Sequence, residues 1–195
     1  MDLAEYFKAE FAEHSDVARR SEAALSGAFA ELVRACVKSV RGGGKLMFFG
    51  NGGSAADAQH LATELTVRYR SDRAAIAAIA LTTDGSALTA GGNDLGFDRV
   101  FARQIEALGR QGDVAIAMST SGKSPNVIAG LKQAKAMGLV TAAFGGNGGG
   151  KMAGLADHLL AVPSATAARI QEMHIVLGQM LCGALEIELG LARSR

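Results

Sequence analysis

The feature that most constrains this fold is an alternation of short apolar runs with longer amphipathic stretches. The runs have the length and composition of buried strands: KLMFFG (45–50), IAAIAL (76–81), DVAIAMS (113–119), LVTAAFG (139–145) and HLLAVP (158–163). The stretches between them are predicted to be helices, at about 54–70, 98–108, 125–137 and 166–190. Strands that alternate with helices form βαβ units around a buried parallel sheet. We therefore predict an α/β fold with a five-stranded, doubly wound parallel sheet.

Residues 1–41 precede the first strand and are predicted to be helical. Their apolar residues recur at i, i+3 and i+4, and the segment RGGG ends the pattern. We expect these N-terminal helices to extend the core. No linker or low-complexity segment interrupts residues 1–195, so we expect one domain.

Charge and cysteine content narrow the classes of partner and compartment. The formal net charge is +1, which argues against a nucleic acid or an anionic membrane as the main partner. Cys36 and Cys182 form no CxxC motif and are interpreted as free thiols in a reducing compartment. The acidic N-terminus is unlike a signal peptide, and no apolar run approaches the roughly 20 residues of a membrane span. We expect a cytoplasmic protein.

The segment MSTSGKSPN (118–126) contains Gly-Lys-Ser, which also ends a nucleotide-binding P-loop. A P-loop needs the pattern G-x-x-x-x-G-K-[ST]. Its first glycine would fall at Ala117, inside the predicted strand. The sequence therefore argues against a P-loop.

The same segment can hold a single phosphate group in another way. Four hydroxyl groups follow the strand, on Ser119, Thr120, Ser121 and Ser124. Gly122 allows the backbone to approach a ligand, and Ser124 and Pro125 suit the first positions of a helix. The amides of that helix's first turn favour an anion. This pattern predicts a sugar-phosphate cradle; an ordinary turn with capping serines is the alternative.

GNGGSAADAQH (50–60) repeats this design after the first predicted strand. Gly52 and Gly53 permit close approach, and Ser54 is expected to cap the next helix together with Asp57. His60 and Glu64 are at i and i+4, so they share one helix face. Imidazole and carboxylate form half of a divalent-metal site, although such a pair is also a common surface contact.

Four longer segments resemble those of one enzyme family. GNGGSAADAQHLATEL, GGNDLGFDRVFARQIEALGRQGDV, STSGKSPNV and RIQEMHI are similar to segments of the sedoheptulose-7-phosphate isomerases, also called phosphoheptose isomerases, of the sugar-isomerase (SIS) superfamily. The resemblance extends over nearly the whole chain. It implies a flavodoxin-like SIS sandwich and the conversion of sedoheptulose 7-phosphate to D-glycero-D-manno-heptose 7-phosphate, for the heptose of bacterial surface glycans such as lipopolysaccharide. It also implies one zinc ion per subunit and a cytoplasmic homotetramer, with residues 1–41 in its interface and active sites between subunits.

The resemblance assigns roles to individual residues. Substrate contacts are expected at Asn51, Gly52, Gly53, Ser54, Glu64, Asn93, Asp94, Ser119, Thr120, Ser121, Ser124 and Gln171. Metal ligands are expected at His60, Glu64, Gln171 and Gln179. Glu64 is also the expected catalytic base, because moving a proton between C1 and C2 of a ketose needs a base over those carbons.

Gln179 departs from the family pattern, which has a histidine eight residues after Gln171. That histidine binds metal and exchanges protons with the glutamate. Glutamine can ligate a metal or donate a hydrogen bond, but it cannot exchange a proton near pH 7. The sequence therefore leaves catalysis in question, whether Gln179 is natural or a deliberate substitution. His174 lies nearby and is interpreted as structural.

Other side chains and functions stay open at this point. Arg68 and Arg73 contact either the substrate or a salt-bridge partner, and Asp57 either supports His60 or only caps the helix. A non-catalytic SIS module that binds a phosphosugar or a protein, like a related protein that binds the replication initiator, is the main alternative to the isomerase. A module of that type does not need Glu64. A phosphosugar-sensing domain is a third hypothesis, but no DNA-binding segment accompanies it here.

Overall fold

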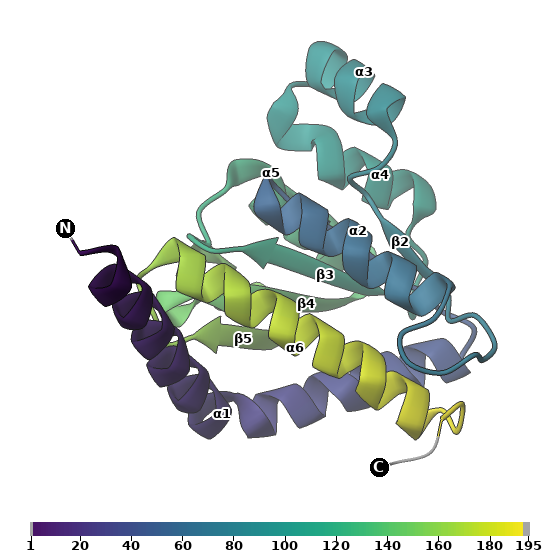
Figure 1. Cartoon of the computed structure of the whole chain (residues 1–195). Coiled ribbons are helices and arrows are strands. Elements are labelled where there is room, and N and C mark those ends of the chain that lie inside the picture. Colours follow the sequence, from purple (N-terminus) through teal and green to yellow (C-terminus); the bar gives the residue numbers. More distant parts are fainter. Residues whose placement is uncertain (1, 193–195) are drawn as a thin grey trace.

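The computed structural model describes residues 2–192 and contains a five-stranded sheet, parallel throughout, in the order β2-β1-β3-β4-β5 (Figure 1). The strands are β1 (Leu46–Gly50), β2 (Ala78–Ala80), β3 (Val114–Ser119), β4 (Val140–Gly146) and β5 (His158–Val162). The predicted strands and the doubly wound parallel sheet are confirmed.

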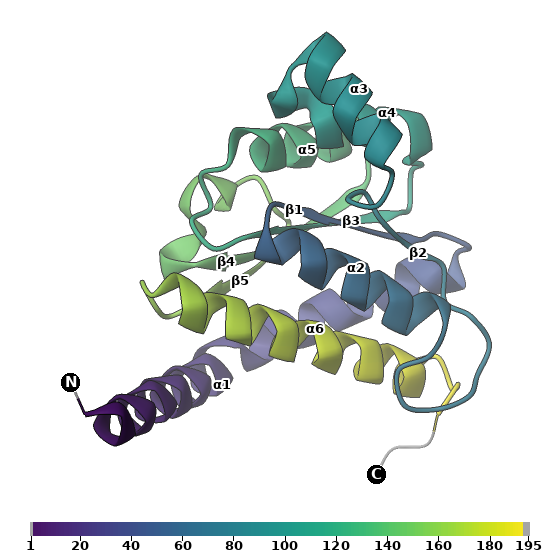
Figure 2. The same cartoon turned by 45° about the horizontal axis from the view of Figure 1, so that its top comes forward.

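Helices cover both faces of this sheet (Figure 2). The α-helices are α1 (Leu3–Arg41), α2 (Gly53–Thr66), α3 (Gly85–Leu95), α4 (Val100–Leu108), α5 (Pro125–Ala136) and α6 (Ala167–Glu188). Two 3₁₀ segments, η1 (Phe97–Arg99) and η2 (Asn147–Met152), complete the described elements. One apolar cluster joins α1, α2 and α6 to one face of the sheet, and a second joins α4 and α5 to the other.

The strands alternate their side chains between these two clusters. Leu46 and Phe48 of β1 point to the α1, α2 and α6 side, whereas Met47 and Phe49 point to the α4 and α5 side. All four are fully buried. This burial on both faces explains why the strand is an unbroken apolar run.

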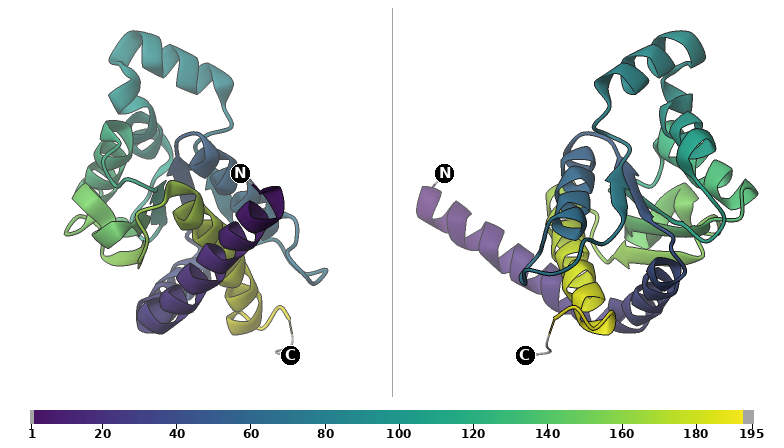
Figure 3. Two further views of the ribbon diagram at one scale, coloured as in Figure 1. Left: turned by 60° about the vertical axis from the view of Figure 1, so that its left-hand side comes forward. Right: turned by 90° about the vertical axis from the view of Figure 1, so that its right-hand side faces the viewer.

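A single helix, α1, forms the N-terminal region, where several helices were predicted. It has 39 residues and begins at a cap in which Asp2 Oδ1 accepts the Ala4 N–H at 2.9 Å. Its second half packs on the core through residues such as Leu32 and Cys36. Its N-terminal end projects from the body of the molecule (Figure 3), whereas Val17 is already buried in the core.

The prediction for the segment after β2 was wrong, because the helices predicted from the sequence left out TTDGSALTAGGND (82–94). The structure has α3 at Gly85–Leu95, with Asp84 Oδ1 accepting the Ala87 N–H at 2.9 Å. None of the residues of α3 is buried, so the segment lacks the apolar stripe that identifies a helix in sequence. This helix packs on α4 and stands away from the sheet (Figure 3).

Two further boundaries bear on the site. The helix predicted at 54–70 ends at Thr66, and residues 67–77 form an irregular segment before β2. Within residues 2–192, no helix combines the length and apolar character that a membrane span requires.

Candidate functional site

The loops after β1 and β3 meet at the point where the strand order reverses. Gly50, at the end of β1, lies opposite Met118 of β3, and the chain proceeds from β1 to one side of the sheet and from β3 to the other. Ligands of doubly wound folds bind outside the strand ends at such a switch point. The two Gly- and Ser-rich loops therefore lie together at the position where folds of this class bind ligands.

The loop Ser119–Ser124 is shaped by its own hydroxyl groups. Ser119 Oγ accepts the Gly122 N–H at 3.1 Å and lies 3.4 Å from Ser124 Oγ, while Ser121 Oγ accepts the Lys123 N–H at 3.2 Å. Gly122 has a φ of 61°, and a Cβ there would lie 2.2 Å from the Gly149 oxygen. A glycine is therefore required at this turn.

The helix after this loop starts as predicted, with Ser124 at the N-cap and Pro125 at its first position. The Ser124 side chain makes no capping hydrogen bond within the helix. Its hydroxyl faces Ser119, where it is free to bind a ligand oxygen. This geometry fits the predicted cradle better than a turn whose serines only cap.

Asn51 and Asn126 join the two loops. Each side-chain amide donates to the other's oxygen at 2.8 Å, and Asn126 Oδ1 also accepts the Val127 N–H at 2.9 Å. Asn126 is 2% exposed. The sequence analysis missed Asn126, because no local pattern indicates a partner 75 residues away.

The predicted cap of α2 was wrong. Gly52, with a φ of 56°, is the N-cap, and it makes no side-chain hydrogen bond. Ser54 is buried inside the first turn, so Ser54 and Asp57 form no capping box. A left-handed glycine starts this helix, and its first amides stay available to a ligand.

Gln171 of α6 lies against the start of α2. A Cβ on Gly53 would be 2.0 Å from Gln171 Nε2, so a side chain there would displace the Gln171 amide. Asp57 lies beside them, and its buried Oδ2 has no hydrogen-bond partner. Burial raises the pKa of the Asp57 carboxyl, against the opposing effects of Gln171 and His60.

Further along the contact between the two helices, His60 and Glu64 of α2 meet Gln179 of α6. His60 Nε2 lies 3.1 Å from Glu64 Oε1 and 3.3 Å from the Gln179 side-chain nitrogen. The side chains of His60 and Glu64 are 47% and 19% exposed, so solutes can reach the group. We call these three residues the His60 cluster.

Close packing of α2 on α6 builds the His60 cluster. A Cβ on Gly178 would lie 2.4 Å from Leu61 Cδ1, so Gly178 allows the two helices to approach next to Gln179. Cys182, one turn later, places its Sγ 3.9 Å from the Leu61 oxygen. Both cysteines are free and buried, as predicted.

His174 has the environment of a structural residue, as expected. It is fully buried, and its Nε2 lies 3.2 Å from the Gly145 carbonyl oxygen, which can only accept. Burial lowers the pKa of His174 to about 4, against the opposing effect of the Gly145 hydrogen bond. His174 is therefore neutral near pH 7 and offers no exchangeable proton to the site.

The two arginines after α2 have different roles. Arg68 is exposed. Arg73 has a side chain that is 1% exposed and forms an ion pair with Glu186 of α6, Nε to Oε1 at 2.9 Å. Of the two hypotheses for Arg73, the structure favours the salt bridge over the substrate contact.

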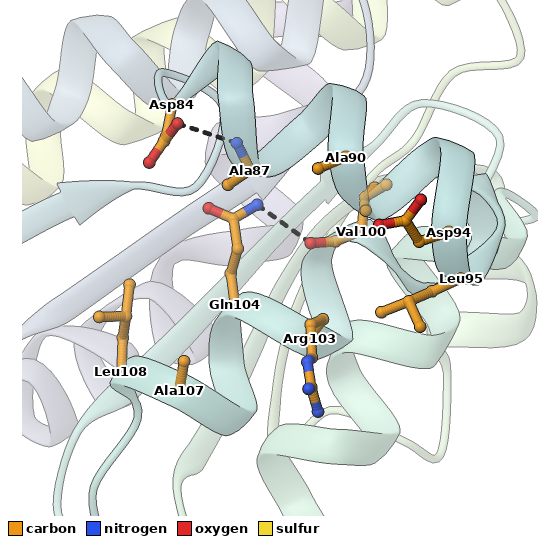
Figure 4. A pocket seen from close by; sticks show the side chains of 11 residues that line it. Asp84, Ala87, Ala90, Asp94, Leu95, Val100, Arg103, Gln104, Ala107 and Leu108 are labelled. Carbon is orange, nitrogen blue, oxygen red and sulfur yellow. Dashed lines mark hydrogen bonds between the residues drawn. The ribbon is translucent and has the colours of Figure 1, made fainter.

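Asn93 and Asp94 lie on α3, apart from the His60 cluster. Their side chains hydrogen-bond to each other at 2.7 Å. Asp94 borders a hollow of about 490 Å³ between α3 and α4 (Figure 4), lined also by Arg103 and Gln104. None of the residues lining this hollow belongs to the His60 cluster or to the loop Ser119–Ser124. Their role in substrate binding stays a prediction.

The His60 cluster has the donors of a partial metal site. It offers one imidazole nitrogen, one carboxylate and, after rotation of the amide, the Gln179 oxygen. Within residues 2–192, no group of three or more His, Cys, Asp or Glu residues is arranged to hold a metal ion. The cluster therefore fits a divalent ion held by two strong donors and one weaker amide oxygen.

Comparisons with known proteins agree with this geometry. A profile of the SIS domain matches residues 10–146. The chain is 58% identical to the phosphoheptose isomerase of Paramagnetospirillum magneticum, over 95% of this chain and 97% of that protein. It is 51% identical to that of Campylobacter jejuni, over 91% and 95% of the two chains.

Solved structures give the same answer at the level of the whole fold. The phosphoheptose isomerase of Neisseria gonorrhoeae superposes with a TM-score of 0.89 at 44% identity, over 94% of this chain and 98% of that one. That of Francisella tularensis superposes with a TM-score of 0.92 at 32% identity, over 95% and 98%. The sequence resemblance, the sheet order and the loops at the switch point thus lead to one conclusion: the chain belongs to the phosphoheptose isomerase family of SIS-domain proteins.

Proposed function

We propose that this chain is a ketose–aldose isomerase that converts sedoheptulose 7-phosphate to D-glycero-D-manno-heptose 7-phosphate. The observation that carries the proposal is the His60 cluster. It places the Glu64 carboxylate 3.1 Å and the Gln179 amide 3.3 Å from the His60 imidazole, where α2 packs on α6. Relatives named phosphoheptose isomerase at 58% and 51% identity support it.

The loop Ser119–Ser124 binds the phosphate group in this proposal. Its hydroxyls and the first-turn amides of α5 supply donors, and the positive end of the α5 dipole favours the dianion. The Asn51–Asn126 pair joins this loop to the start of α2, so both ends of the sugar are held by one rigid frame. Asn51, Gly52, Gly53 and Ser54 are the proposed contacts for the sugar hydroxyls.

Glu64 is the proposed base. It removes the proton from C1 of the ketose and returns it to C2 of the resulting enediol, which gives the aldose. Its carboxylate is 19% exposed, so it is sheltered yet reachable. Gln179 donates a hydrogen bond to a substrate oxygen, and a water or the substrate itself must supply the proton that a histidine would bring.

A divalent ion, which we propose to be zinc, would be held by His60, Glu64 and the amide oxygens of Gln179 and Gln171. When bound, it polarises the carbonyl oxygen of the sugar. Because amides are weaker ligands for zinc than imidazole, we expect looser binding than a site with a second histidine would give.

A homotetramer with active sites between subunits is part of the proposal. Large apolar side chains stand exposed along the first half of α1, with Leu3 at 72%, Phe7 at 63% and Phe11 at 59%. Val176 and Met180 of α6 are 40% and 50% exposed near the His60 cluster. Unpartnered apolar faces of this kind are typical of subunit interfaces. Light scattering at several concentrations tests this; a monomer at all of them would contradict it.

The experiment that tests the function is turnover of sedoheptulose 7-phosphate by the purified chain, with and without zinc, beside a Gln179→His variant. Turnover in the parent chain means that Glu64 and a donor other than histidine suffice. Turnover only in Gln179→His means that the chain keeps the site but lacks its proton donor. No turnover in either folded protein would contradict the isomerase and favour a binding role. One observation supports that role: Gln179 stands where the family pattern has a histidine.

A further inference from the structure

We propose that the buried ion pair between Arg73 and Glu186 is a positioning device that holds the two helices of the His60 cluster at their catalytic spacing. The inference rests on the proposed function, because it concerns residues that act through Glu64 and Gln179. Neither Arg73 nor Glu186 is expected to touch the substrate. Both lie at the far end of the contact between α2 and α6.

The first observation is that the Arg73 side chain caps the C-terminal end of α2. Its guanidinium donates to the backbone oxygens of Glu64 and Leu65, each at 2.7 Å, and to that of Ala74 at 3.1 Å. The last carbonyls of a helix lack partners within the helix, and a cation there also complements the helix dipole. Arg73 thus holds the backbone of Glu64, the proposed base.

The second observation is the anchor on α6. Glu186 Oε1 accepts from Arg73 Nε at 2.9 Å and from the Tyr69 N–H at 3.1 Å. Glu186 lies seven residues after Gln179 on the same helix, which is two turns. The pair therefore connects the end of the helix that carries His60 and Glu64 to the helix that carries Gln179.

The third observation is burial. The side chains of Arg73 and Glu186 are 1% and 2% exposed. A buried ion pair adds little net stability compared with apolar side chains of similar volume, and its best-supported use is to define a geometry. The guanidinium meets four acceptors in a fixed plane, which a lysine cannot reproduce.

The test uses the full chain with Arg73→Met, Arg73→Lys and Glu186→Gln, beside Ile105→Ala as a control for lost stability. Ile105 is fully buried on the opposite side of the sheet. Below the unfolding temperature of each protein, we expect kcat to fall about 10- to 100-fold in Arg73→Met and Glu186→Gln, with KM changed less than about threefold. Arg73→Lys should recover only part of the loss, and Ile105→Ala should keep the parent kcat.

A double variant, Arg73→Met with Glu186→Leu, separates positioning from stability. Replacing the pair by apolar side chains should restore the melting temperature, yet leave the Glu64 carbonyl without the Arg73 hydrogen bond, whereas the Leu65 carbonyl keeps the Ile76 N–H. We expect kcat to stay low in this variant. Recovery of kcat together with stability would overturn the inference, as would a parent-like kcat in a folded Arg73→Met.

Two further readouts do not depend on turnover. Zinc affinity, measured by competition with a chromogenic chelator, should fall about 10- to 100-fold in Arg73→Met and not in Ile105→Ala. Hydrogen exchange of residues 60–66 should accelerate in Arg73→Met only. If neither the parent chain nor Gln179→His has turnover, the proposed function fails, and unchanged exchange and zinc affinity in Arg73→Met would overturn this inference separately.

Discussion

Two parts of the candidate site differ in how far apart their residues lie along the chain. The phosphate cradle occupies Ser119–Ser124, and its hydroxyls hydrogen-bond within those six positions. The His60 cluster joins α2 to α6 across 119 positions, through one contact of 3.3 Å. Binding groups can thus be built by a short loop, whereas the reacting groups depend on how two helices pack.

This difference predicts separate effects on KM and kcat. Changes in the cradle should weaken binding and leave the chemical step unaltered. Changes in the His60 cluster, or in the residues that position it, should slow the chemical step.

Glu64→Gln should have the largest effect, a fall in kcat of about 10³-fold, because general-base catalysis contributes 10²- to 10⁴-fold. The glutamine keeps the shape of the side chain but cannot accept the proton. Steady-state kinetics with sedoheptulose 7-phosphate measure this, with Glu106→Gln on α4 as the matched control. A fall in affinity with unchanged kcat would place Glu64 among the binding groups. It would contradict the division between a cradle that sets KM and a His60 cluster that sets kcat.

Acid should destabilise the chain through His174, on the same helix as Gln179. Burial lowers the pKa of His174 from 6.5 to about 4, so the folded protein holds it neutral. The corresponding stability is complete above about pH 6.5 and is lost as the pH falls toward 4. It amounts to roughly 3 kcal/mol.

Urea unfolding of the parent chain and of His174→Gln, at several pH values from 7 to about 4, measures this contribution. The parent should lose stability more steeply than the variant over this range. Equal slopes of the free energy of unfolding against pH would mean that His174 does not contribute to the acid sensitivity of the protein.

Gln179→His should raise kcat by about 10²-fold, because an imidazole near the sugar can exchange a proton near pH 7. KM should change little, since the cradle is untouched. Gln179→Leu is the control that removes the amide without adding a proton donor. If kcat fails to rise in a folded Gln179→His, another group already supplies the proton.

Ser124→Ala should have the smallest effect, a rise in KM of about tenfold with kcat nearly unchanged. A hydrogen bond to a charged group contributes about 1.5–3 kcal/mol, and the neighbouring hydroxyls and amides compensate for part of it. Kinetics of this variant beside Ser164→Ala, which lies outside the cradle, provide the measurement. A fall in kcat with unchanged KM would erase the division between cradle and cluster.

Local chemistry explains which elements could be predicted. The apolar runs predicted all five strands, and Ser124 with Pro125 predicted the start of α5. The α3 helix was missed because it buries none of its residues and therefore has no apolar stripe. The cap of α2 was predicted at Ser54, since serine is a common cap, but a left-handed Gly52 starts the helix.

Long-range contacts explain most of what could not be predicted. From the sequence, Arg73 could contact either the substrate or a salt-bridge partner. Only its burial against Glu186 favours the salt bridge. Asn126 was not singled out, although it joins the cradle to Asn51. The spacing of His60 and Glu64 showed that they share a helix face, but not that Gln179 meets them.

Hydrophobic periodicity, glycine positions and short motifs are local properties of the chain, so the parallel sheet, the proposed cradle loop and the family could be predicted from them. Which side chains meet across α2 and α6 depends on the tertiary structure. Gly178 lets those helices approach, and the Arg73–Glu186 pair joins their far ends. Such contacts depend on how whole faces pack together, and no short window of sequence contains that information.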